Sequence, residues 1–217
     1  MARPKIPRKS TSIDMTAMCD VAFLLLSFFI LTTKFKPEEA ITVSTPNSVA
    51  TKVAPDKDVV LITIDKDGKV FLSLDNTQIK GTIADALNNT KNLGINKAAF
   101  VKAGFYGASF SQLNSFLAIP EDQRKGNNLP GIPCIDSSHN EVTEWLRIVK
   151  DAYMGQKKFI LVKGDNSSKY PSFKNVIDAL KKNDELKFSL VTNPEAAPTG
   201  TDLWKQNQAP ASSKKEE

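Results

Sequence analysis

The hydrophobic pattern of this chain begins with one long apolar or weakly polar run between Met15 and Thr33, MTAMCDVAFLLLSFFILTT. As an α-helix, the run would extend about 28 Å, close to the ~30 Å hydrocarbon thickness of a bilayer. We therefore predict a single transmembrane helix over residues 13–33. A basic segment, residues 1–12, precedes it. Residues 34–58, rich in Pro, Thr, Ser and Val, predict an extended linker.

Shorter periodic segments predict a folded domain over residues 59–192. VVLITI and KVFLSL, joined by the turn sequence DKDG, predict a β-hairpin. Further strands are predicted at AAFVKA, KFILVK and residues 186–192, and the linker segment ITVST also alternates as a short strand would. Apolar residues at helical spacing predict helices over residues 82–93, with Thr82 as N-cap, over 140–154 and over 171–182.

This order of elements predicts an α+β fold. A single N-terminal transmembrane helix is followed by a small α/β sandwich domain, with two main helices packed on one face of a mixed sheet. Residues 104–138 are rich in Gly, Pro, Asn and Ser and predict an insertion with one short helix around 110–118. Residues 193–217 consist largely of Pro, Ala, Thr, Lys and Glu, and we expect a disordered tail.

The charge distribution predicts the orientation of the helix. The net charge is +5, and four basic residues with no acidic one lie in the first nine positions: Arg3, Lys5, Arg8 and Lys9. Basic residues before a first membrane segment favour a cytoplasmic N-terminus, which Lys34 and Lys36 oppose only weakly. We therefore expect the domain outside the cytoplasmic membrane, in the periplasm of a bacterium. No basic stripe with interleaved aromatics indicates nucleic-acid binding.

A cleavable signal peptide is the alternative, because it also begins with charged and then apolar residues. The apolar stretch is long, however, and Asp20 interrupts the part that should be most apolar. Thr32-Thr33-Lys34 is also a poor cleavage site. We expect the helix to be retained as an anchor.

Asp20 is the candidate proton-translocating residue. A carboxylate at this depth costs about 2.5–3.5 kcal/mol on insertion scales, and no Lys, Arg or His in the helix could neutralise it. Thr16 and Ser27 lie within about 40° of it on the same face, a polar stripe that should meet protein or water. The alternative is that both hydroxyls only bond their own backbone. Desolvation favours the neutral carboxyl, which could load a proton on one side and release it on the other.

Asp14 lies near the cytoplasmic boundary of the helix, where it could cap the N-terminus or line a proton exit. His139, the only histidine, has no Cys, His or carboxylate partners at metal-ligand spacing. We find no catalytic triad, phosphate loop or paired catalytic carboxylates, so we expect no enzymatic activity, metal or cofactor. Cys19 and Cys134 should lie at different depths, which argues against an internal disulfide and leaves a Cys134–Cys134 bridge between two copies open.

The stretch IDMTAMCDVAFLLL, residues 13–26, resembles the membrane signature of the ExbD/TolR family, in which a Thr-Pro-x-x-Asp-Val pattern opens a single helix. Asp20 falls on the family's proton-carrying aspartate and Thr16 on its threonine, whereas Ala17 stands where the family usually has proline. KFILVKGD, Tyr170, VID at 176–178 and FSL at 188–190 are similar to the family's periplasmic domain. The length of the predicted insertion resembles members from Bacteroidota.

The resemblance implies a subunit of a proton-driven motor in the inner membrane. Two copies would lie inside a pentamer of a multi-pass ExbB-like or TolQ-like partner and drive a TonB-like or TolA-like protein. An ExbD-like role in TonB-dependent outer-membrane transport is the leading hypothesis. A TolR-like role in a Tol-Pal envelope-maintenance system, or a membrane-tethered periplasmic binding module, is the alternative. A lone carboxyl suits a proton better than sodium, although the nearby hydroxyls leave sodium open.

Overall fold

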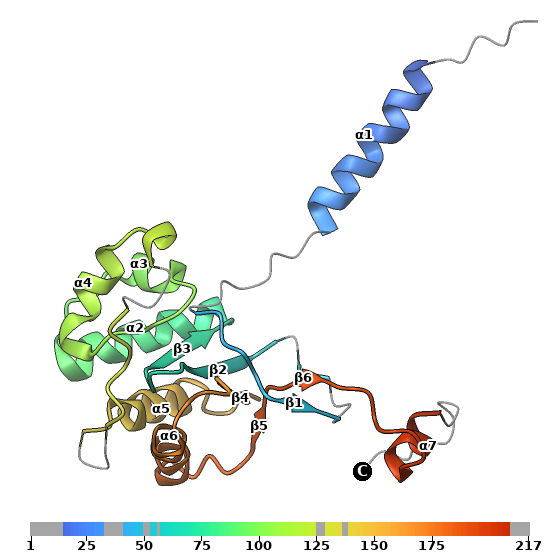
Figure 1. Ribbon diagram of the computed structural model, residues 1–217. Coiled ribbons are helices and arrows are strands. Elements are labelled where there is room, and N and C mark those ends of the chain that lie inside the picture. The colour runs from blue at the N-terminus through green and yellow to red at the C-terminus, as the bar shows by residue number, and fades with distance from the viewer. Residues whose placement is uncertain are drawn as a thin grey trace, which may run out of the picture. The chain divides into compact units, whose positions relative to one another are not determined.

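The structure is a computed structural model that describes residues 15–32, 41–49, 53–55, 57–124, 129–135 and 139–208. It divides the chain into two compact units, residues 1–36 and 37–217, which are described separately. The first unit contains α1 (Met15–Thr32), a helix of 18 residues (Figure 1). Among the described residues, α1 alone is long and apolar enough to cross a membrane.

The second unit is an α+β domain. Its strands are β1 (Asn47–Ser48), β2 (Val59–Ile64), β3 (Val70–Leu74), β4 (Phe159–Gly164), β5 (Phe188–Leu190) and β6 (Asn193–Pro194). Its α-helices are α2 (Thr77–Lys91), α3 (Lys97–Lys102), α4 (Leu113–Ala118), α5 (Glu141–Ala152), α6 (Tyr170–Lys182) and α7 (Asp202–Gln208). Two 3₁₀ turns, η1 (Phe110–Gln112) and η2 (Glu121–Gln123), flank α4.

The central sheet is mixed and has the order β3-β2-β4-β5. β2 and β3 are antiparallel, as the hairpin sequence predicts, while β4 pairs in parallel with β2 and with β5. Asp65 organises the hairpin turn, because its Oδ1 accepts the backbone N–H of Asp67 at 2.7 Å and of Lys69 at 3.1 Å. Gly68 supplies the positive φ of 82° that the turn requires.

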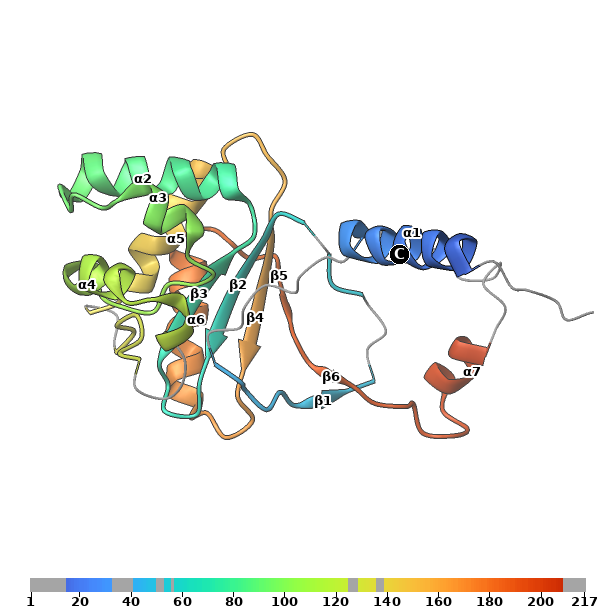
Figure 2. The same cartoon turned by 90° about the horizontal axis from the view of Figure 1, so that it is seen from above.

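A helical layer packs on one face of this sheet. Figure 2 shows α2, α5 and α6 on one side of the strands, and β1 and β6 on the other. The alternate β2 residues Val60, Ile62 and Ile64 are fully buried. Asn183 joins α5 to α6, because its Nδ2 donates to the carbonyls of Thr143 in α5 and Ala179 in α6. These features confirm the predicted α+β fold, with α2 added to the expected layer.

The predicted insertion is part of the domain core. Tyr106 exchanges two backbone hydrogen bonds with Leu72, at 2.9 and 2.7 Å, so this segment continues the sheet beyond β3. Trp145 of α5 is fully buried and stacks on three aromatic rings of the α3–η1 region, with centroid distances of 5.2, 5.4 and 6.3 Å to Phe110, Tyr106 and Phe100. The insertion and α5 therefore form one aromatic core.

Gly107 is expected to be intolerant of any side chain. A Cβ at this position would overlap Cδ1 and Cε1 of Phe71, a fully buried side chain. We expect Gly107→Ala to lower the free energy of unfolding by about 1–3 kcal/mol. Urea denaturation of the full chain in detergent measures this. Gly164→Ala is the matched control, because its Cβ would meet nothing within 4 Å. Equal stability of the two variants would contradict the prediction.

Two of the predicted elements are wrong. AAFVKA, expected as a strand, belongs to helix α3, because the Asn96 side chain accepts the backbone N–H groups of Ala98 and Ala99 and so caps a helix. Helix α2 does not begin at Thr82. Asn76 caps it in the same way, and its first residue is Thr77.

The folded domain also extends beyond both expected boundaries. We expected residues 34–58 to be a linker, yet Ile41, Val43 and Thr45 are buried. We expected disorder from residue 193, yet β6 pairs in parallel with β1. The two ends of the domain are therefore paired through β1 and β6. Helix α7 also lies within the segment that we expected to be disordered.

Candidate functional site

The surface of helix α1 is mostly apolar, and two of its hydroxyl groups donate hydrogen bonds to backbone carbonyls of the same helix. Ser27 Oγ donates to the carbonyl of Leu24 at 2.9 Å, and Thr32 Oγ1 donates to that of Phe28 at 2.8 Å. Such bonds make hydroxyls tolerable in hydrocarbon, where every polar group needs a partner. The sequence left open whether Ser27 belongs to a polar stripe that meets protein or water, or only bonds its own backbone. The structure contains this backbone bond.

Asp20 is the one charged residue of α1, and every side chain of the helix except the partly covered Ser27 is exposed in the single chain. The helix places Thr16 about one turn before Asp20 and Ser27 about two turns after it, on the same face. Asp14, the expected cap or proton exit, lies outside the described residues.

Neither cysteine belongs to a candidate site. Cys134 is buried, and its desolvation raises the pKa of the thiol to about 11, although a hydrogen bond with Asn140 opposes the shift. The burial of this thiol inside the domain argues against the bridge between two copies that the sequence left open. Cys19 is exposed on α1 and is also a free thiol.

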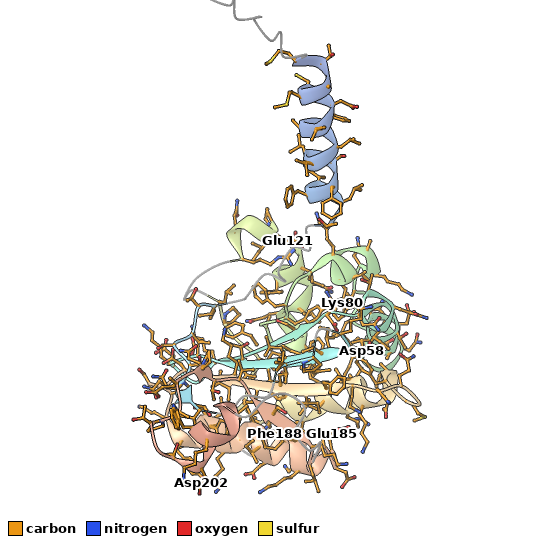
Figure 3. The ribbon with its side chains drawn as sticks, turned by 90° about the vertical axis from the view of Figure 1, so that its right-hand side faces the viewer. Asp58, Lys80, Glu121, Glu185, Phe188 and Asp202 are labelled. Carbon is orange, nitrogen blue, oxygen red and sulfur yellow. The ribbon has the colours of Figure 1, made fainter. Side chains whose placement is uncertain are left out.

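Lys80 is a buried polar residue that the sequence did not reveal. It lies in α2 (Figure 3), and its Nζ donates to the carbonyl of Ala103 at 2.8 Å, which ties α2 to the end of α3. Desolvation lowers its pKa, while Asp75 and Glu121 raise it. The predicted helix began two residues after Lys80, so its burial could not be inferred. One amine bonded to a carbonyl is a structural link, not a reactive centre.

The domain offers no constellation for catalysis within the described residues. No group of three or more His, Cys, Asp or Glu there could hold a metal ion. A shallow groove of about 230 Å³ lies between α2 and α5, with Ala86, Ile148 and Ala152 among its lining residues and Arg147 and Asp151 adding charge. Its lining contains no Ser, Cys or His. The chemical interest of the chain therefore rests on α1.

A helix long and apolar enough to cross a membrane, followed by one α+β domain, is typical of single-anchor membrane proteins. The family model for the biopolymer transport protein ExbD/TolR matches residues 7–195, and the chain belongs to this family. The match spans α1 and the domain through β6. No curated protein matches the chain significantly. No solved structure does so either. Members of the family are transport proteins, not enzymes, and their role is energy transduction in biopolymer transport.

Proposed function

We propose that this chain is an ExbD-like subunit of an inner-membrane motor that couples the proton motive force to TonB-dependent outer-membrane transport. The observation that carries the proposal is Asp20, the single charge on a membrane-length apolar helix. Family membership supports the coarser role in energy transduction. Each charge that crosses 100 mV makes about 2.3 kcal/mol available, enough to bias a mechanical step.

The exposed carboxyl on α1 implies partner chains in the membrane. One helix cannot shield Asp20 from lipid, and an uncovered charge there costs about 2.5–3.5 kcal/mol. Other helices must therefore surround the face that carries Thr16, Asp20 and Ser27. An ExbB-like or TolQ-like multi-pass protein fits this need, with two copies of the present chain inside its pentamer. The motor would drive a TonB-like or TolA-like protein.

Helix geometry favours the proton over sodium as the coupling ion. Thr16 lies about 6 Å before Asp20 along the helix axis, and Ser27 lies about 10 Å after it. Several oxygen ligands of a metal ion must approach it together to within about 2.5 Å. Ser27 cannot share an ion with Asp20 over that distance. One carboxyl with at most one nearby hydroxyl is suited to binding a proton.

The basic N-terminus supports an orientation for the proposed subunit. Residues 1–12 would lie in the cytoplasm and the α+β domain in the periplasm of an inner-membrane protein. Asp14, near the cytoplasmic boundary, would then cap α1 or line the proton exit. The length of the segment 104–138 supports a Bacteroidota-type member of the family.

Co-purification from native membranes tests the proposed partners. We expect the full chain, captured in mild detergent, to retain a multi-pass ExbB-like protein in excess over itself. Mass spectrometry of the same sample should find the N-terminus intact, with Asp20 present. Capture of a TolQ-like protein, with peptidoglycan binding by the domain, would assign the TolR-like role instead. A mature chain that begins after Thr33 would contradict both roles, since it has lost Asp20.

A further inference from the structure

Two carboxylates lie close together at the edge of the central sheet where β2 begins and β3 ends. Asp58 directly precedes β2, and Asp75 directly follows β3. Oδ1 of Asp75 accepts the backbone N–H of Val59 at 2.9 Å, and Oδ1 of Asp58 accepts an N–H of the Asn76 side chain at 2.8 Å. Each carboxylate therefore bonds the chain neighbour of the other, and this reciprocal pair of bonds holds the two side chains together.

Neither carboxylate has a counter-ion in contact with it. Within the described residues, Oδ2 of Asp58 and Oδ2 of Asp75 accept no hydrogen bond, and neither residue forms an ion pair. Lys80, labelled with Asp58 in Figure 3, lies near Asp75, but its Nζ donates to the carbonyl of Ala103. Two negative charges held close together repel each other and destabilise the fold. One oxygen of each carboxylate is therefore available to a cation.

Tyr153 brings a third oxygen to the same edge. It follows the last residue of α5, and the chain then enters β4, whose first residue, Phe159, donates its N–H to the carbonyl of Asp58 at 2.9 Å. The tyrosine is only 1% exposed, and its hydroxyl has no hydrogen-bond partner among the described residues. Burial raises the pKa of this phenol, and the charges of Asp75 and Asp58 raise it further. The hydroxyl is therefore near both carboxylates.

The Tyr153 hydroxyl is close to the two carboxylates but bonds to neither of them. Because a buried hydroxyl without a partner is costly, a ligand that bridges the three groups would be stabilising. Oxygens that share one Ca²⁺ at about 2.3–2.6 Å lie about 3.3–5 Å from one another, beyond the range of most hydrogen bonds. Carboxylate and neutral oxygens are also the ligands that Ca²⁺ prefers. The arrangement and the chemistry of the three groups therefore fit a shared calcium ion.

We propose that Asp58, Asp75 and Tyr153 form a calcium site that joins the start of β2, the end of β3 and the end of α5. The carboxylates supply the charge, and the phenol, which stays protonated, supplies a neutral oxygen. Water would complete the shell of about six to eight ligands, because Asp75 is exposed to solvent. With only two carboxylates, we expect a Kd of about 10⁻⁴–10⁻³ M, as in extracellular calcium modules. The site is separate from Asp20 and its proposed role.

The proposed site revises our sequence-based expectation that the chain binds no metal ion. A whole hairpin separates Asp58 from Asp75 in the sequence, and Tyr153 lies far from both, so no local spacing connects the three ligands. The antiparallel pairing of β2 with β3 places the two carboxylates together, and the end of α5 adds the phenol.

Calcium titration of the full chain, freed of metal with a chelator and held in a non-ionic detergent, tests the site. For a Kd in the proposed range, Ca²⁺ at about 10 mM should lower the equilibrium constant of unfolding about 10- to 100-fold, as measured by urea denaturation. Asp75→Asn keeps an oxygen for the N–H of Val59 but removes the charge, and should reduce the effect to less than about twofold. Asp67→Asn is the matched control, because Asp67 is exposed at the opposite end of the same hairpin. It should respond to Ca²⁺ like the unchanged chain.

Terbium luminescence tests where the ion binds. Tb³⁺ occupies calcium sites made of oxygen ligands, and a nearby phenol excites its emission. We expect the full chain to show Tb³⁺ emission that Ca²⁺ displaces. Most of this emission should be lost in Tyr153→Phe, which removes the hydroxyl and keeps a buried aromatic ring.

Three results would overturn the calcium site. The first is an unfolding equilibrium that Ca²⁺ does not shift, or that Mg²⁺ shifts equally. The second is an equal response to Ca²⁺ in Asp75→Asn and Asp67→Asn, which would show adsorption of the ion to surface charge only. The third is Tb³⁺ emission that is unchanged in Tyr153→Phe, which would place the bound ion elsewhere in the chain.

Discussion

Replacing Asp20 with asparagine is expected to abolish proton-driven transport while leaving the complex assembled. The amide has nearly the same volume as the carboxyl, so helix packing should be preserved, but it cannot bind and release a proton at accessible pH. Transport and proton flux should fall to the background of membranes that lack the chain. A pH-sensitive dye inside vesicles that contain the purified complex measures the flux.

Two variants serve as controls for this experiment. Asp20→Glu keeps a titratable carboxyl on the same face and should retain part of the flux. Cys19→Ser changes the neighbouring residue, which points about 100° away around α1, and should retain nearly all of it. Normal flux through Asp20→Asn, in a complex that co-purifies as usual, would contradict the assignment.

The largest effect on stability is expected from Trp145→Ala. This residue is fully buried and stacks on Phe100, Tyr106 and Phe110, so truncation opens a large cavity between α5 and the insertion. We expect the free energy of unfolding to fall by about 3–5 kcal/mol. Urea denaturation of the full chain in detergent, monitored by circular dichroism, measures this decrease in the free energy of unfolding.

Two further substitutions separate packing from hydrogen bonding at this position. Trp145→Phe should cost much less than alanine, because the indole Nε1 has no hydrogen-bond partner in the part of the chain that the structure describes. Tyr170→Ala, at an aromatic residue that is 72% exposed, should change stability by less than about 0.5 kcal/mol. Comparable losses for Tyr170→Ala and Trp145→Ala would show that the aromatic stack is not the core.

Local periodicity predicted the elements that short-range interactions specify. The β2–β3 hairpin follows from its DKDG turn, and α5 and α6 follow from apolar residues at helical spacing. The Asp20 face of α1 follows from helix geometry alone. In each case, the residues that decide the structure are close together in the sequence.

The missed features depend on distant contacts or on single caps. The alternation from Ile41 to Thr45 was visible, but its partner Asn193 lies 148 residues from Thr45, and no local pattern connects them. At α3, the Asn96 cap outweighed a strand-like composition. In the proposed motor, the surroundings of Asp20 are supplied by other chains, whose residues this sequence does not contain.

Infrared spectroscopy of the carboxyl group at position 20 tests the central claim most directly. The purified complex, compared with its Asp20→Asn variant, should show the infrared band of a protonated carboxyl group. The band should be absent from the variant. An assembled complex without this band, in which Asp20 is ionised like a carboxylate in bulk water, would contradict its role as the proton carrier.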